Sequence, residues 1–253
     1  MKNILGIGSA GCNIVEQLSE YPVYKCHHIS NEIKKTSKYK FALTELDGPE
    51  EYESMDMSKL HKWLSTIEKN CTVFLCGASN SAGITLRALH VLHQRGVKVE
   101  IVYFRPETEV LSEEKTLSER AFRGILQNYA RSGLFEGMRL ICNLRLEEIA
   151  GSTNVFEYYS QINRVFTNTY YMIDVFKNTK PITSTFKRPK DSCRISTIGL
   201  SAVEGEEKLF FPFNQETEVV YYYGINEEKL KTEENLFRTI TDKVKERITD
   251  ETK

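Results

Sequence analysis

Two segments of this sequence repeat one order of elements: a short apolar run, a turn rich in glycine and other small residues, and a helical pattern. Residues 2–6 lead through Gly6–Gly11 into a helix over 13–18, and residues 72–76 lead through Gly77–Gly83 into a helix over 84–94. A parallel strand can be reached only through a crossover connection, which is usually a helix. The repeated order therefore predicts an α/β fold.

The alternation continues along the chain. Further strands are expected over residues 23–29, 97–104 and 138–142, and further helices over 57–67, 117–132 and 155–176. The polar stretch 34–54 is expected to be a surface excursion. We therefore expect a mostly parallel sheet with helices on both faces.

After residue 177 the composition changes, and we place a domain boundary there, with one domain over 1–178 and a reduced α+β second domain over 179–253. Strands are expected over 194–200 and 218–225. A final amphipathic helix is expected over 232–248, with an apolar stripe formed by Phe237, Ile240, Val244 and Ile248. This stripe either packs on the small second sheet or binds a partner.

The composition excludes several classes of protein. Thirty-four basic and 35 acidic residues leave a net charge of -1, which disfavours an extensive nucleic-acid surface. No run of 18 apolar residues occurs, so we expect no membrane span and a cytoplasmic protein.

The six cysteines lack a Cys-x-x-Cys pair and are expected to be reduced core residues. His90 and His93 have no third ligand at a recognisable spacing, so exposed histidines are favoured over a metal site.

A glycine-rich turn before a helix is suited to anions, because backbone N–H groups approach the ligand and the helix dipole favours negative charge. Two such turns in one sheet indicate a nucleotide, although glycine also occurs in strand-to-helix turns for packing reasons alone. Taken alone, the first turn matches Gly-x-Gly-x-x-Gly. With Glu32 as a ribose-binding acid, Gly6, Gly8 and Gly11 are also compatible with an NAD(P)-binding oxidoreductase.

The order of several segments resembles the tubulin/FtsZ superfamily of nucleotide-dependent filament proteins. Residues 7–13 look like its first phosphate loop, and Asn31-Glu32 resembles the segment after its second strand. Residues 77–106 align without a gap with its signature loop, helix and following strand. Residues 141–146 resemble a segment whose Asn contacts the nucleotide, and 159–163 resemble the stretch of the central helix that stacks on guanine and reads its edge. Residues 218–225 and the helix from 232 resemble part of its second domain.

The resemblance implies a guanine nucleotide, GTP or GDP, with Mg²⁺, and head-to-tail self-association. The implied binding residues are Gly8, Ser9, Ala10, Gly11, Cys12, Asn13, Asn31, Gly77, Ala78, Ser79, Asn80, Ser81, Asn143, Tyr159 and Asn163. The amide of Asn163 offers both a donor and an acceptor to a base edge, and Tyr159 lies one helical turn before it. Without the neighbouring segments, a tyrosine in a long helix is more often a core residue.

The sequence departs from the family at two places that concern catalysis. The signature loop, Gly-Gly-Gly-Thr-Gly-Thr-Gly in the family, reads Gly-Ala-Ser-Asn-Ser-Ala-Gly here, which adds side chains where backbone approaches phosphate. Ser79, Asn80 and Ser81 could still donate hydrogen bonds. Residues 177–190 contain no carboxylate, whereas the family places acids spaced Asn-x-Asp-x-x-Asp there to complete the active site of the neighbouring subunit.

We therefore expect a divergent, shortened guanine-nucleotide-binding protein, viral or plasmid-borne, whose GTP hydrolysis is slow or absent because no carboxylate polarises the attacking water. Two alternatives stay open. One is a structural or adaptor protein that keeps the fold but no longer binds nucleotide. The other is the NAD(P)-binding oxidoreductase.

Overall fold

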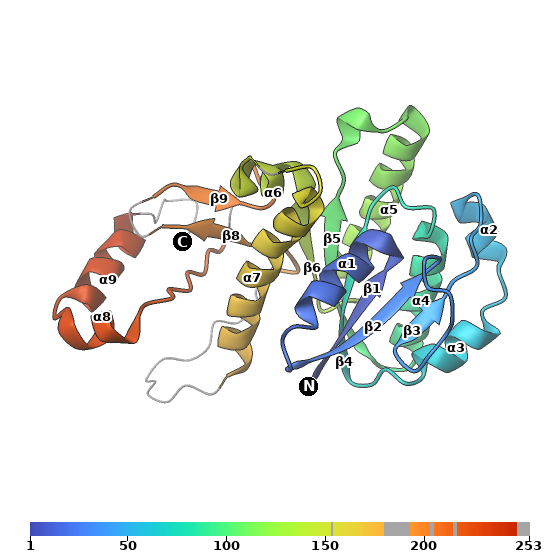
Figure 1. Cartoon of the computed structure of the whole chain (residues 1–253), viewed down its shortest axis with the longest axis horizontal. Coiled ribbons are helices and arrows are strands. Elements are labelled where there is room, and N and C mark those ends of the chain that lie inside the picture. Colours follow the sequence, from blue (N-terminus) through green and yellow to red (C-terminus); the bar gives the residue numbers. More distant parts are fainter. Residues whose placement is uncertain (153, 180–192, 203–204, 215–216, 247–253) are drawn as a thin grey trace.

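The computed structural model describes residues 1–152, 154–179, 193–202, 205–214 and 217–246 (Figure 1). These residues contain a seven-stranded sheet in which every pair of neighbouring strands is parallel. The predicted α/β class is thereby confirmed. The spatial order is β3 (Lys40–Ala42), β2 (Tyr24–Ser30), β1 (Lys2–Ile7), β4 (Asn70–Cys76), β5 (Lys98–Arg105), β6 (Gly137–Cys142) and β7 (Ile195–Ser196).

Helices cover both faces of this sheet (Figure 1). One face carries α1 (Gly8–Leu18) and the long central helix α7 (Tyr158–Asn178). The other face carries α3 (Ser58–Leu64), α4 (Ala82–Gln94) and α5 (Glu113–Arg131). A short 3-10 helix, Thr108–Val110, connects β5 to α5.

Strand β4 shows why the sheet needs both layers. Val73 and Leu75 pack in the hydrophobic cluster under α3, α4 and α5, whereas Phe74 packs in the cluster under α1 and α7. All three side chains are at most 1% exposed. The Phe74 ring lies edge-on to Phe166 and Tyr170 of α7, with centroids 6.2 and 5.4 Å away. A strand buried on both faces is continuously apolar, and this feature made it recognisable in the sequence.

The carboxyl ends of the strands and the amino ends of the helices that follow them share one edge of the sheet, uppermost in Figure 1. Helix α1 begins at Gly8, directly after β1, so the loop expected before residue 13 is absent. Helix α4 follows β4 after the turn 77–81, and α6 (Asn143–Ala150) follows β6 directly. Ligands of parallel α/β sheets bind at this edge.

The segment 34–54, expected to be a surface excursion, contributes to the core. It contains the edge strand β3 and helix α2 (Pro49–Ser54). Phe41 is 7% exposed and Tyr52 is 2% exposed, and the Tyr52 hydroxyl donates to the Thr44 carbonyl oxygen over 2.9 Å. The expectation was wrong because single aromatic residues in a polar stretch produce no period from which burial can be predicted.

The strand expected over 194–200 is divided into two. Strand β7 extends the main sheet beside β6, and β8 (Gly199–Ser201) pairs with the antiparallel strand β9 (Glu207–Leu209). Between them, the Thr197 hydroxyl donates to the Leu140 carbonyl oxygen over 2.8 Å, which turns the chain from one sheet to the other. The small antiparallel sheet agrees with the expected α+β character of this region, and the boundary after residue 178 stays a prediction.

Two further expectations for this region were wrong. Residues 218–225 form no strand, although their sequence has strong β propensity, because propensity favours extended backbone but only a ladder makes a strand. The single helix expected over 232–248 is divided into α8 (Glu227–Thr232) and α9 (Leu236–Glu246). Asn226 starts α8 early by accepting a hydrogen bond from the Glu228 N–H over 2.8 Å. Ile248 lies outside the described residues.

The six cysteines form no disulfide bridge, but they are not all core residues. Cys71 and Cys142 are buried, and Cys12, Cys26 and Cys76 are half-buried. Cys193 is exposed, so the expectation of a core position was wrong for it. Cys193 lies two residues before β7, in a short polar segment whose hydropathy does not indicate whether a side chain is buried.

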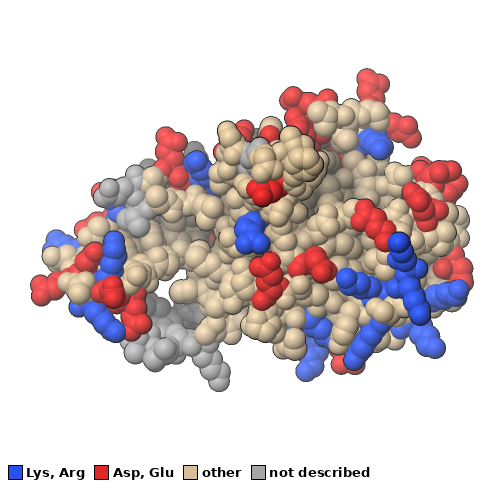
Figure 2. Space-filling model, in the orientation of Figure 1, with Lys and Arg blue, Asp and Glu red and all other residues tan. Residues whose placement is uncertain are grey.

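Charges of both signs are present on the visible face of the molecule (Figure 2). Exposed lysines gather in and before β3, at Lys34, Lys35, Lys38 and Lys40. Lys40 forms an ion pair with Glu16 of α1, with 3.6 Å between Lys40 Nζ and Glu16 Oε2. No helix within the described part of the chain is long and apolar enough to cross a membrane.

Candidate functional site

The first glycine turn is built by close packing of α1 against the sheet. A Cβ atom at Gly6 would lie 2.5 Å from the Gly11 carbonyl oxygen, and one at Gly11 would lie 2.2 Å from the Phe74 carbonyl oxygen. These two glycines thus bring the first turn of α1 into contact with β1 and β4. Gly8 is different, because its φ of +75° is the left-handed region that glycine adopts without strain.

The amino end of α1 has the properties of an anion site. No side chain caps it, and its first turn contains no acidic residue. Ala10 and Asn13 are exposed and Ser9 is half-buried, so a ligand can reach this turn. Unpaired backbone N–H groups and the positive end of the helix dipole favour a phosphate there.

Cys12 lies on the opposite side of the same turn. Its thiol points toward the carbonyl oxygens of Gly6 and Ile29, with Sγ···O distances of 3.4 and 3.5 Å. Burial raises the pKa of this thiol to about 12, so it is neutral at physiological pH. Its side chain faces the protein interior, and any ligand contact of Cys12 would come from its backbone.

Strand β2 delivers Asn31 and Glu32 to the same edge. Both are exposed, and the Ser9 hydroxyl donates to the Glu32 carboxylate over 2.6 Å. Glu32 is positioned in turn by its own N–H, which donates to Ser30 Oγ over 3.2 Å. Glu32, the residue after the predicted Asn31, therefore contacts the predicted first turn through Ser9.

The second glycine turn contains a left-handed residue that is not glycine. Ala78 has a φ of +58°, a left-handed conformation that costs a residue with a Cβ about 1–2 kcal/mol. Ser79 and Ser81 hydrogen-bond to each other, with 2.8 Å between their hydroxyl oxygens. The Asn80 side chain turns away and donates to the Asp47 carbonyl oxygen over 3.2 Å.

The two turns touch. A Cβ at Gly8 would lie 3.1 Å from Ser81 Oγ and 3.5 Å from Ser79 Oγ. The contact follows from the register, since Ile7 of β1 is paired with Leu75 of β4 and the turns leave the sheet side by side. The two serine hydroxyls therefore lie over the glycine of the first turn.

The remaining predicted residues come from α6 and α7. Asn143 is the first residue of α6 and is half-buried. Tyr159 is 71% exposed, so it is not a core residue, and its ring lies edge-on to Tyr158 with 5.1 Å between centroids. Asn163, one helical turn later, is half-buried. A hydrogen bond from the Tyr158 hydroxyl to Glu147 raises the pKa of Tyr158 to about 12 and links the two helices.

Helix α7 is fixed beside α1 by Gln17. Its amide nitrogen donates to the Ser160 carbonyl oxygen over 3.0 Å, and its amide oxygen accepts from the Thr167 hydroxyl over 3.3 Å. Because Ser160 lies between Tyr159 and Asn163 in the sequence, this packing holds both residues close to α1. The bond also gives the start of α7 a defined position relative to the first turn.

A buried acid behind the second turn was missed in the sequence. Glu119 of α5 is 0% exposed, and its Oε1 accepts from the Tyr103 hydroxyl over 2.9 Å and from Arg123 Nε over 2.8 Å. A Cβ at Gly77 would lie 2.0 Å from the Tyr103 hydroxyl, so Gly77 rests directly on this pair. The only signal in the sequence was the spacing of four between Glu119 and Arg123 on a helix.

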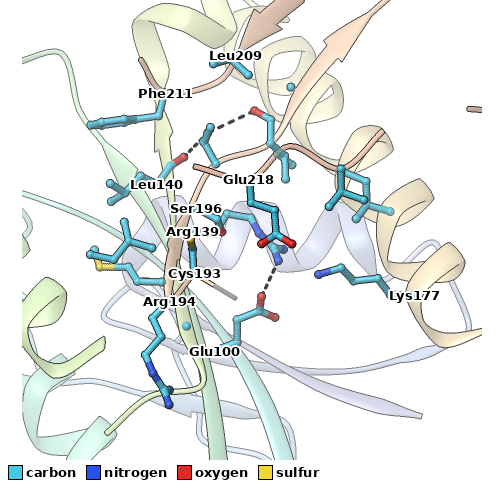
Figure 3. A pocket seen from close by; sticks show the side chains of 18 of the residues that line it. Glu100, Arg139, Leu140, Lys177, Cys193, Arg194, Ser196, Leu209, Phe211 and Glu218 are labelled. Carbon is cyan, nitrogen blue, oxygen red and sulfur yellow. Dashed lines mark hydrogen bonds and ion pairs between the residues drawn. The ribbon is translucent and has the colours of Figure 1, made fainter. Parts of the chain in front are cut away.

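A cavity of about 1330 Å³ lies elsewhere, at the amino ends of β1, β4, β5 and β6 (Figure 3). None of the predicted binding residues lines it. Glu100 and Arg139 form an ion pair of 2.7 Å at its wall, and Lys177 points toward it from α7. Burial acts to raise the pKa of Glu100, but the charges of Arg139 and Lys2 hold that pKa below its ordinary value.

His90 and His93 are both exposed on α4. Within the described ranges, no group of three or more His, Cys, Asp or Glu side chains could hold a metal ion.

Comparison with known proteins gives a match at the level of structure only. No protein-family model matches the chain, and no curated protein does. An empty FtsZ dimer from M. jannaschii is similar with a TM-score of 0.56 and 13% identity, over 73% of this chain and 57% of that one. CetZ2 from Haloferax volcanii, a GTPγS-bound protofilament, is similar with a TM-score of 0.51 and 14% identity. The similarity covers 68% of this chain and 58% of that one.

CetZ1 from Haloferax volcanii, a GDP-bound monomer, gives a TM-score of 0.53 and 14% identity, over 68% of this chain and 60% of that one. The chain thus spans 57–60% of the length of these solved structures. The match confirms the resemblance seen in the order of the sequence segments. The chain has the tubulin/FtsZ fold, with a sequence that diverges far from those of the solved structures.

Proposed function

We propose that this protein binds a guanine nucleotide at the carboxyl edge of the sheet, between the two glycine turns and the start of α7. The observation that carries the proposal is the uncapped amino end of α1, whose own first turn contains no acidic residue, beside a second turn with a left-handed residue at Ala78. This arrangement provides backbone N–H groups and a positive dipole to a phosphate chain.

The base would lie against α7. Tyr159 presents an exposed ring for stacking, and Asn163, one turn further along the same face, has an amide that can pair with a guanine edge. Asn143 at the amino end of α6 and Asn31 at the end of β2 supply polar groups at the same edge. The fold supports this reading, because the similar CetZ1 and CetZ2 structures contain GDP and GTPγS.

Hydrolysis is proposed to be slow or absent. The residues from 177 to 190 contain no carboxylate to polarise a water molecule, and most of this segment lies outside the described residues. Head-to-tail self-association is proposed as well, supported by the protofilament form of CetZ2. The contacts of such an assembly would include the nucleotide edge described above.

The test is equilibrium binding of GTP, GDP and ATP to the purified chain with magnesium, together with pelleting. Asn163→Ala should reduce the preference for guanine over adenine about tenfold, the loss expected for one good hydrogen-bonding pair of about 1.4 kcal/mol. Asn168→Ala is the matched control, because Asn168 is exposed on the same helix and contacts Tyr21 instead. No binding at millimolar guanine nucleotide would exclude the proposal.

One observation favours a second candidate, a structural or adaptor protein without nucleotide. The hydroxyl groups of Ser79 and Ser81 lie over Gly8, in space that a phosphate would need. For this candidate we expect assembly or partner binding that is unchanged by guanine nucleotides. Pelleting with and without GTP or GDP separates the two candidates.

A further inference from the structure

We propose that Ser79 and Ser81 limit the length of the phosphate chain, so that the site takes a guanosine mono- or diphosphate in preference to the triphosphate. This inference rests on the proposed function and specifies its ligand. It follows from the order in which a nucleotide would meet the elements of the site, from the spacing between the two turns, and from what holds the second turn in place.

The order follows from the two layers of helices. Helices α7 and α1 lie on one face of the sheet, and α4 lies on the other (Figure 1). A base held by Tyr159 and Asn163 of α7 directs its phosphates across the edge of the sheet, first over the amino end of α1 at Gly8. The turn that leads into α4, with Ser79 and Ser81, is reached last and meets the terminal phosphate.

The two serine side chains occupy the space over Gly8. Ser81 Oγ lies 3.1 Å, and Ser79 Oγ 3.5 Å, from the position that a Cβ atom of Gly8 would take, and the first distance is shorter than most Cβ contacts in proteins. A phosphate oxygen needs about 2.7–3.2 Å to a donor, so a terminal phosphate placed over Gly8 would compete with both serine side chains for this space. Glycines at 79 and 81 would leave this space open, because they lack the side chains that fill it.

The second turn is supported from behind. The Asn80 amide donates to the Asp47 carbonyl oxygen over 3.2 Å, and a Cβ at Gly83 would lie 2.3 Å from the Pro49 carbonyl oxygen. On its other side, Gly77 rests on Tyr103. The turn therefore cannot move away from Gly8 without breaking these contacts.

The two serines also hold each other in place. Their hydroxyl oxygens are 2.8 Å apart, and the Ser81 N–H donates to Ser79 Oγ over 3.3 Å. Rotating either hydroxyl away from Gly8 would break this pair. A site that excludes the third phosphate needs no carboxylate to polarise a water molecule for GTP hydrolysis. This agrees with the absence of carboxylates from residues 177–190.

The experiment measures Kd for GMP, GDP and GTP by isothermal titration calorimetry on the full chain. For the wild type we expect GDP to bind about tenfold or more tightly than GTP. In the double variant Ser79→Gly/Ser81→Gly we expect GTP affinity to rise about tenfold while GDP affinity changes by less than about threefold. The matched control is Ser65→Gly/Ser132→Gly, which removes two serine side chains at the ends of α3 and α5.

The outcomes separate the inference from the proposed function. Equal affinities for GDP and GTP in the wild type, or an unchanged ratio in a folded glycine variant, would overturn the inference and leave nucleotide binding intact. Absence of guanine nucleotide binding in both proteins would overturn the proposed function. Circular dichroism checks folding, and the single variant Ser79→Gly replaces the double variant if the latter does not fold.

Discussion

His27, one of two buried histidines of β2, should make the protein acid-sensitive. His27 is 0% exposed, its ring lies edge-on to Trp63 with centroids 5.8 Å apart, and its Nε2 is 3.3 Å from the Asn3 side-chain oxygen. Its Nδ1 has no hydrogen-bond partner in the described structure. Burial, with the nearby charges of Lys25 and His28, lowers the pKa of His27 from 6.5 to about 4.

The sign and size of the effect follow from linkage. The folded protein keeps His27 neutral, whereas the unfolded chain takes up a proton below pH 6.5, so stability is complete above that pH and falls as the pH approaches 4. One pKa unit corresponds to about 1.36 kcal/mol. The shift therefore removes about 3 kcal/mol in total, of which about 2 kcal/mol is lost between pH 7 and pH 5.

The assay is urea unfolding of wild type and His27→Leu at pH 7, 6 and 5. The variant should lose about 2 kcal/mol less than the wild type between pH 7 and pH 5. His93→Leu, which replaces an exposed histidine of α4, is the matched control for the change from histidine to leucine. If the free energy of unfolding falls by the same amount between pH 7 and pH 5 in His27→Leu and in wild type, the assignment of this loss to His27 is refuted.

Substitutions at left-handed and crowded positions give further tests by urea unfolding. Ala78→Gly should raise the free energy of unfolding by about 0.5–1 kcal/mol by removing left-handed strain, and Lys69→Gly, with a φ of +63°, should give a similar gain away from the site. A loss in both would contradict the strain argument. Gly11→Ala should cost about 3 kcal/mol, because its Cβ would meet the Phe74 carbonyl oxygen. Gly124→Ala, in open space within α5, should instead gain about 0.5–1 kcal/mol, and equal effects at these two glycines would contradict the packing account.

Most of the parallel sheet could be predicted because its strands are short apolar runs buried on both faces, as residues 73–75 of β4 show. The helices that cover it have a clear apolar period. Edge strand β3 and helix α2 were missed because each buries little more than one aromatic side chain, Phe41 and Tyr52. Residues 218–225 were mistaken for a strand because propensity cannot report whether a ladder forms.

For the candidate site, the sequence indicated both glycine turns and the residues around them. The sequence did not show why each glycine of the first turn is needed. In the structure, Gly6 and Gly11 are required by close packing and Gly8 by its left-handed backbone conformation. The inward direction of the Cys12 thiol, the buried acid Glu119 behind Gly77 and the position of the cavity at the opposite end of the strands were not predictable. Each depends on residues far apart in the chain.

The sequence by itself determined the alternation of strands and helices in most of the parallel sheet, the two turns at the carboxyl edge and the absence of acids from residues 177–190, because periodicity, glycine content and composition are local properties. Only the tertiary structure decided that the two turns touch, with Ser79 and Ser81 over Gly8. That contact depends on β1 and β4 being neighbours in register, with Ile7 beside Leu75. Pairing of strands nearly 70 residues apart is a property of the folded sheet, and no local pattern encodes it.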